Sequence, residues 1–156
     1  MPSTGEVENF LGQYDIEVLR FTECTPDAES AARAVGCAVA EIAKSILVNV
    51  GGQPILVVTC GDTKINSSRL KQALRLSGKV RFAAPDEVKV HTGYAPGGVT
   101  PFLLPKKLPV ILDHSLRRFP ATYPAAGDDY SAVSVTVEQL LQFTGGEEAD
   151  VCDLRD

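Results

Sequence analysis

Residues 46–60 read ILVNVGGQPILVVTC, and this stretch decides the fold. Two apolar runs rich in β-branched residues, 46–50 and 54–60, flank the turn-forming residues 51–53. A Gly-rich connection this short predicts an antiparallel hairpin. The second run is apolar at successive positions, so we expect both of its faces to be buried and the strand to lie inside a sheet.

Helix and strand signals are mixed on both sides of this hairpin. Further strands are predicted at residues 16–21, 80–83, 110–113, 132–135 and 149–152. Helices are predicted to begin with caps at Ser3, Thr25, Asn66 and Thr136, with one or two further turns at 85–88 and a stop at Gly78 for the helix after Asn66. The pattern predicts a single α/β domain over residues 1–156, with a mixed central sheet flanked by helices.

Length and composition are those of an ordinary globular domain. The chain has 156 residues, of which 44% are hydrophobic and 22% charged. No apolar run approaches the length needed to cross a bilayer. The first residues lack the basic and apolar regions of a secretory signal. We therefore expect a cytoplasmic protein without membrane contact.

The cysteines and histidines predict no metal site. Cys24, Cys37, Cys60 and Cys152 form no CxxC pair, and His91 and His114 add no closely spaced ligand. We expect the cysteines to be small buried side chains in a reducing compartment.

Charge is unevenly distributed along the chain. The net charge is −5, yet residues 44–118 contain twelve basic and four acidic residues. A basic middle segment in an acidic protein is consistent with a local footprint for a polyanion. Folding can equally interleave the segments and leave no basic patch.

Lys44 is the first residue that could carry chemistry. Strand alternation places it on the same side as Ile46 and Val48, which is an unexpected position for a lysine. Two interpretations are open. The lysine can extend to solvent at the strand end, which the sequence alone favours, or it can point into a pocket and bind a carbonyl or phosphate oxygen.

The segment 92–105 contains three glycines and three prolines and is predicted to be a loop. Adjacent Gly97 and Gly98 would let backbone N–H groups approach an anion or an oxyanion. The alternative is a long surface turn. Asp113, at a strand end, is either a substrate-binding carboxylate or a turn cap.

Three stretches resemble the YbaK/prolyl-tRNA synthetase editing-domain family of aminoacyl-tRNA deacylases. They are EIAKSILV at 41–48, GYAPGGVTPF at 93–102, and VILD at 110–113 followed by SVTVEQL at 134–140. Gly97 and Pro101 stand in GxxxP spacing. The resemblance extends over nearly the whole chain in order.

This resemblance implies a mixed α/β fold and a trans-editing hydrolase. The implied reaction removes a small amino acid such as Ala, Cys or Ser from a mischarged tRNA, often the tRNA for proline. It implies no metal and no organic cofactor. The partners would be the aminoacyl-tRNA acceptor end and prolyl-tRNA synthetase.

The resemblance also assigns roles to residues. Lys44 would be catalytic, and Gly97, Gly98 and Pro101 would belong to the substrate loop. Beside these we predict Tyr94, in the same loop, and Asp113, at its strand end, as further substrate-binding residues. Two positions depart from the family pattern. Leu103 stands where Gly is common and Ser45 where Thr is common. Both departures bear on substrate choice more than on fold.

Two other functions fit the same residues. A non-catalytic module would bind an aminoacyl or nucleotide end, or a synthetase, without turnover. A hydrolase of another small ester or amide would not require the tRNA part of the substrate.

Overall fold

The predicted hairpin forms the centre of the molecule. The structure is a computed structural model that describes residues 3–105 and 107–155. Strand β2 (Ala43–Val50) pairs antiparallel with β3 (Gln53–Cys60), with Val50 opposite Gln53. Gly51 and Gly52 both have positive φ angles, of 58° and 89°, which is why glycine suits this turn.

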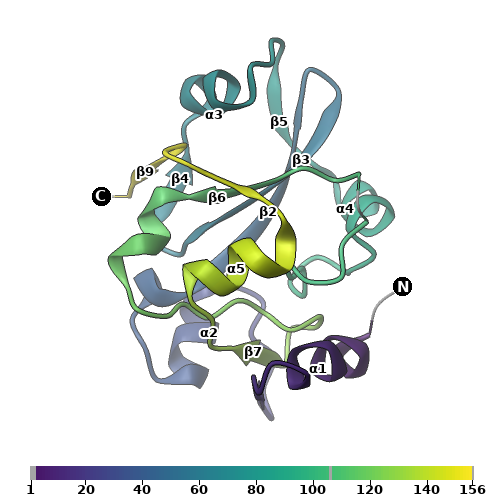
Figure 1. Cartoon of the computed structure of the whole chain (residues 1–156), viewed down its shortest axis with the longest axis vertical. Helices are drawn as coiled ribbons and strands as arrows, with labels where there is room; N and C mark the ends of the chain where they lie inside the picture. The colour runs from purple at the N-terminus through teal and green to yellow at the C-terminus, as the bar shows by residue number, and fades with distance from the viewer. Residues whose placement is uncertain (1–2, 106, 156) are drawn as a thin grey trace.

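A mixed five-stranded sheet is built around this hairpin in the order β5-β2-β3-β6-β8 (Figure 1). Strand β3 runs parallel to β6, and β6 runs parallel to β8. The added strands are β5 (Val80–Phe82), β6 (Val110–Asp113) and β8 (Glu147–Ala149). The predictions of a mixed α/β fold and of an interior second strand are both confirmed.

Two small antiparallel ribbons and seven helical segments complete the described part of the chain. The ribbons pair β1 (Val18–Arg20) with β7 (Ser131–Val133), and β4 (Thr63–Ile65) with β9 (Cys152–Leu154). The α-helices are α1 (Thr4–Gly12), α2 (Ala28–Val35), α3 (Ser67–Leu74), α4 (Pro85–Thr92) and α5 (Val137–Thr144). The 3-10 turns are η1 (Val39–Glu41) and η2 (His114–Arg118). None of these helices has the length and hydrophobicity that a membrane crossing requires.

The sheet separates two hydrophobic clusters. Odd-numbered β2 residues such as Leu47 face a cluster completed by α1, α5 and the loop after α4, while Val48 and Val50 face a cluster completed by Leu70 of α3. Figure 1 shows α3 on the opposite side of the sheet from α1. Lys44 lies on the same side of β2 as Val48, as strand alternation predicts.

Several predicted boundaries were wrong. Asp27, not Thr25, caps α2, because its carboxylate accepts from the Ser30 N–H at 2.8 Å. Helix α3 ends at Leu74, where Arg75 adopts a left-handed conformation, and so stops before Gly78. The single strand predicted over 149–152 is two strands, β8 and β9, separated by Asp150 and Val151.

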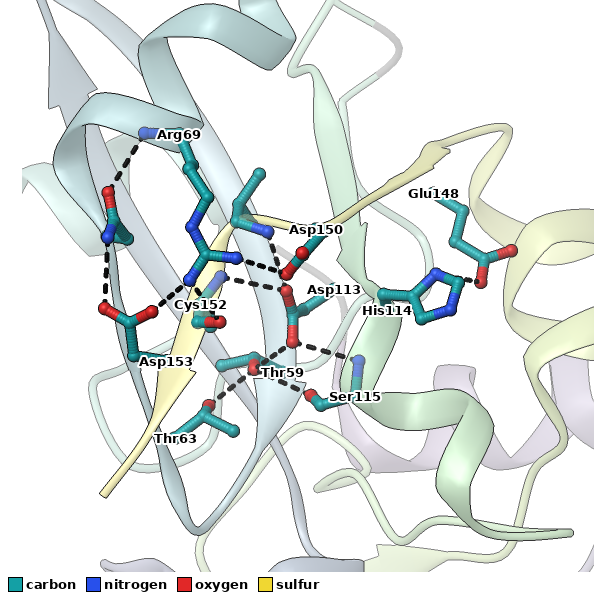
Figure 2. Close-up of polar contacts among 12 residues, drawn as sticks. Thr59, Thr63, Arg69, Asp113, His114, Ser115, Glu148, Asp150, Cys152 and Asp153 are labelled. Atoms are coloured by element: carbon teal, nitrogen blue, oxygen red, sulfur yellow. Dashed lines mark hydrogen bonds and ion pairs between the residues drawn. The ribbon is translucent and has the colours of Figure 1, made fainter. Parts of the chain in front are cut away.

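Asp113 explains the break between β8 and β9. Its Oδ1 accepts from the N–H groups of Val151 and Cys152, at 2.9 and 3.0 Å (Figure 2). Its Oδ2 accepts from the Ser115 N–H at 3.1 Å and from the Thr59 hydroxyl at 3.4 Å. The carboxyl group thus replaces the sheet partners that the backbone lacks at this point.

We expect Asp113→Ala to destabilise the fold strongly. The substitution leaves three backbone N–H groups without an acceptor, and each unsatisfied buried group costs about 1–3 kcal/mol. The free energy of unfolding, measured by urea denaturation, should fall by roughly 3 kcal/mol or more. Glu17→Ala, at an exposed carboxylate, is the control and should leave it unchanged within about 0.5 kcal/mol. Equal stability of the two variants would contradict the role given to Asp113.

Candidate functional site

A cavity of about 350 Å³ lies where the first turn of α2, the start of β2 and the loop after α4 meet. Its size is at the lower end of the range for small-molecule sites. Lys44 and Gly97 line it. Tyr94, Gly98 and Pro101 belong to the same loop but do not contribute to the lining.

Lys44 lies in the wall of this cavity and is half-buried. Its Nζ donates to the backbone carbonyl of Thr63 at 2.7 Å. An ammonium group has three N–H donors, so two remain for a ligand. Burial, and then the positive charge of Arg155, lower the pKa of Lys44. The structure therefore places Lys44 in a pocket, the interpretation that the sequence alone disfavoured.

Two cations and one carboxylate line the cavity. Arg155 lines it together with Lys44, and Asp27 lines it from the N-terminus of α2. Asp62, the acidic group beside Lys44, binds the Arg118 guanidinium with both oxygens, at 2.6 and 3.0 Å. Its charge is thereby largely compensated, and the cavity keeps an excess of positive charge on the side of Lys44.

The Gly-rich loop is held in place from within. The Tyr94 hydroxyl donates to the carbonyl of Phe102 at 2.5 Å, and both side chains are buried. Phe102 packs against Phe143 of α5 with 6.0 Å between ring centroids. Tyr94 is therefore placed to shape the loop that presents Gly97, and not to contact a ligand in the cavity.

The two adjacent glycines differ in their surroundings. The Gly98 N–H donates to the carbonyl of Ala95 at 3.0 Å, so it is not available for an oxyanion. No backbone hydrogen bond within residues 3–105 and 107–155 uses the Gly97 N–H. A Cβ on Gly98 would lie 2.6 Å from the Cα of Asp128, which shows that this glycine permits close packing of two chain segments.

Small side chains make up much of the remaining cavity wall, beside the larger Ile42, Val99 and Tyr123. Five alanines line it: Ala28, Ala31, Ala43, Ala125 and Ala132. Ser45 also lines it, and the Ser45 Oγ is buried without a hydrogen-bond partner in the described part of the chain. A buried hydroxyl without a partner is costly unless a ligand supplies one.

Asp113, predicted as a substrate-binding residue, is 2% exposed and is not part of the cavity wall. Its oxygens accept hydrogen bonds from backbone N–H groups and from the Thr59 hydroxyl (Figure 2). Asp113 therefore acts as a cap, which is the alternative that the sequence left open. His114 is exposed and lies 3.6 Å from Glu148. Neither His91 nor His114 lines the cavity.

The cysteines divide between core and surface. Cys60 and Cys152 are buried, as expected, whereas Cys37 is only partly buried and Cys24 is exposed. The Cys24 thiol donates to Asp129 at 2.8 Å, and this hydrogen bond is the main reason why the pKa of Cys24 is raised. A thiol with a raised pKa is a weak nucleophile. Within the described residues, no group of three or more His, Cys, Asp or Glu side chains could hold a metal ion.

Folding partly interleaves the basic and acidic segments. Arg69 pairs with Asp150 and Asp153, and Arg117 pairs with Glu138 and Glu148. These acidic partners all come from the last part of the chain. The basic residues that remain near the cavity are Lys44 and Arg155, so the positive field there is local.

A larger hollow, of about 710 Å³, lies at the opposite end of the sheet. It is lined by the start of β3, the start of β6 and the end of α3. None of the predicted site residues lines it. Of these two hollows in the described part of the chain, the smaller one is the candidate site, because Lys44 and Gly97 both line it.

Sequence reasoning missed several residues of the cavity wall. Arg155 and Asp27 line it without having been assigned there, whereas Ser45 lines it as its link to substrate choice implies. The run of alanines in α2 was a usable signal, since small residues on a helix face can border a cavity. Arg155 gave no local signal, because only the pairing of β4 with β9 brings it to Lys44.

Comparison with known proteins gives a consistent set of relatives. The aminoacyl-tRNA editing domain family matches residues 22–143. The uncharacterised protein YwhH of Bacillus subtilis strain 168 is 37% identical over 138 residues, which are 87% of each chain. The proline–tRNA ligase of Lysinibacillus sphaericus strain C3-41 is 30% identical over 101 residues, which are 64% of this chain and 18% of the ligase.

Solved structures give the same result. A protein described as a proposed trans-editing enzyme for prolyl-tRNA synthetase superposes with a TM-score of 0.86 at 29% identity, over 98% of each chain. The hypothetical protein APE2540 superposes with a TM-score of 0.84 at 28% identity, over 94% of this chain and 99% of that one.

We expect Gly98→Ala to disrupt the loop and the cavity. The added methyl group would overlap the Asp128 backbone, and such overpacking costs typically about 1–3 kcal/mol. The melting temperature should fall. Gly12→Ala is the matched control, since a Cβ at Gly12 meets no atom within 4 Å, and it should not lower the melting temperature. A Gly98→Ala protein as stable as the control would show that the loop can move aside.

Proposed function

Because this chain belongs to the aminoacyl-tRNA editing domain family, we propose that it is a trans-editing deacylase that hydrolyses mischarged aminoacyl-tRNA. The observation that carries the proposal is Lys44, a half-buried lysine in the wall of a small cavity beside the Gly97 loop. No metal or organic cofactor is part of the proposal. The cytoplasm remains the expected location of a protein with this proposed substrate.

The chemistry needs little beyond charge stabilisation. An aminoacyl ester is already activated, so attack by water or by a group of the substrate suffices when the developing oxyanion is stabilised. Lys44, held by Thr63, offers two further N–H donors from a fixed position. The Gly97 N–H is the backbone candidate for the same oxygen. The Gly98 N–H is not a candidate, because it already donates to the carbonyl of Ala95. Removing one such donor typically slows a reaction about 10²–10³-fold.

The alanine-lined wall supports a small amino acid as the group removed. Alanine, cysteine and serine are the substrates that we propose, carried on the tRNA for proline. The relation to proline–tRNA ligase and to the proposed trans-editing enzyme supports this tRNA. Prolyl-tRNA synthetase is then the proposed partner. Size selection in such a pocket is modest, at about 10–200-fold per methylene.

A binding module without turnover is the alternative. It would use the same cavity to hold an aminoacyl or nucleotide end. The fixed Lys44 ammonium favours catalysis, because a half-buried cation in the cavity wall supplies donors for a developing negative charge.

We expect Lys44→Ala to lose deacylation by at least about 100-fold while remaining folded, because it removes the oxyanion donor. The measurement is release of the amino acid from Ala-, Cys- and Ser-charged tRNA for proline. Lys64→Ala, at an exposed lysine of β4, is the matched control and should retain activity. Full activity of Lys44→Ala would refute the mechanism. A folded wild-type protein that releases none of the three amino acids would favour the binding module.

We expect Ala31→Leu to exclude substrates by filling the cavity. Ala31 lines the cavity from α2, whereas Ala34, on the same helix, is exposed. Both changes are nearly neutral for helix formation, since Ala and Leu are strong helix formers. The KM for Ala-charged tRNA should rise about tenfold or more in Ala31→Leu and stay unchanged in Ala34→Leu. Equal KM values in the two variants would place the amino acid elsewhere.

A further inference from the structure

Arg155 occupies the exposed rim of the cavity. It lines the cavity yet is itself exposed to solvent. Its backbone N–H donates to the carbonyl of Asp62 at 2.7 Å, and the next carbonyl, that of Thr63, accepts from the Lys44 Nζ. Two consecutive carbonyls therefore fix the position of the backbone of Arg155 and that of the Lys44 side chain.

Within residues 3–105 and 107–155, the Arg155 guanidinium forms no ion pair, and the nearby carboxylate of Asp62 is already paired with Arg118. Arg155 lies close enough to Lys44 for its charge to lower the pKa of the lysine. Two cations held this close repel each other, so the arrangement favours an anionic ligand between or beside them.

The chemistry of the substrate decides which anion that is. The amino acid of an aminoacyl ester has no free carboxylate and carries a positive α-ammonium, which a second cation would repel. The nearest anions of the substrate are the phosphodiesters of the RNA end. A planar guanidinium can bind two phosphate oxygens at once, which a lysine cannot.

We propose that Arg155 binds a phosphodiester of the tRNA 3′ end at the rim of the cavity while Lys44 acts on the ester inside it. This inference rests on the proposed function, since it names the part of the same substrate that Arg155 recognises. The acidic protein then needs no extended basic surface to hold its RNA.

The polar contacts in Figure 2 hold β9, the strand that directly precedes Arg155. Strand β9 pairs with β4, with Leu154 opposite Thr63. Asp113 accepts from Val151 and Cys152, and Arg69 donates to the carbonyl of Cys152 at 2.9 Å. The Arg155 side chain therefore extends from a backbone segment that hydrogen bonds hold on both sides.

The test compares substrates with and without phosphate. One is an acceptor-stem minihelix mischarged with alanine, and the other is 3′-O-alanyl-adenosine, which contains no phosphate. In Arg155→Ala we expect KM to rise about tenfold for the minihelix, with kcat nearly unchanged. The KM for alanyl-adenosine should not change, and Arg155→Lys should recover part of the loss. Arg33→Ala, at an exposed arginine in the last turn of α2, is the matched control.

Two results would overturn the inference. One is a KM for the minihelix in Arg155→Ala equal to that of the wild type. The other is an equal loss on both substrates, which would mean that Arg155 acts on the ester site and not on phosphate.

A binding measurement separates this inference from the proposed function. Affinity for the uncharged minihelix is followed by fluorescence anisotropy at several salt concentrations. Loss of one single-strand phosphate contact should reduce the slope of log K against log salt by about 0.7 in Arg155→Ala. If the wild type deacylates nothing, the proposed function fails, and this slope alone decides the role of Arg155. An unchanged slope would reject it.

Discussion

The arrangement of the site depends on the hydrogen bonds that the buried carboxyl group of Asp113 accepts. A polar group is costly to bury unless it is fully hydrogen-bonded, and Asp113 meets this condition with backbone N–H groups from two separate segments. Through Val151 and Cys152 it fixes the start of β9, and β9 pairs with β4. Because β4 supplies the carbonyl that holds the Lys44 ammonium, a residue outside the cavity determines the geometry inside it.

The second constraint is the loop after α4, which reaches the cavity without regular secondary structure. Its conformation is set by the buried Tyr94 and Phe102, which are joined by one hydrogen bond and packed into the main core. Between these anchors the chain is free to present Gly97 at the cavity, while Gly98 allows the loop to lie against Asp128. The loop is therefore anchored on both sides of Gly97, which is the arrangement that a preorganised donor requires.

The sequence was informative where the signal was local. The hairpin, the interior position of β3 and the side of β2 that carries Lys44 all follow from alternation and from the Gly-rich turn. It was uninformative where contacts join distant segments. Asp113 looked like a site residue because strand ends often carry function, but its partners lie 38 and 39 residues further along the chain. Arg155 reaches Lys44 only through the pairing of two short strands, which no local pattern in those strands reveals.

The proposed function poses an electrostatic problem, because an acidic protein would have to bind RNA, and the ion pairs bear on this problem. The net charge of −5 repels a polyanion at long range, and most of this repulsion is screened beyond about 8 Å at physiological ionic strength. What decides binding is then the field within the cavity. Arg118 neutralises Asp62 beside Lys44, and Arg69 and Arg117 take up acidic groups of the last segment. Within the described residues, Lys44 and Arg155 form no ion pair, and both line the cavity. The proposed contact with the end of the tRNA, where the ester is, therefore uses cations that no carboxylate of the described residues neutralises.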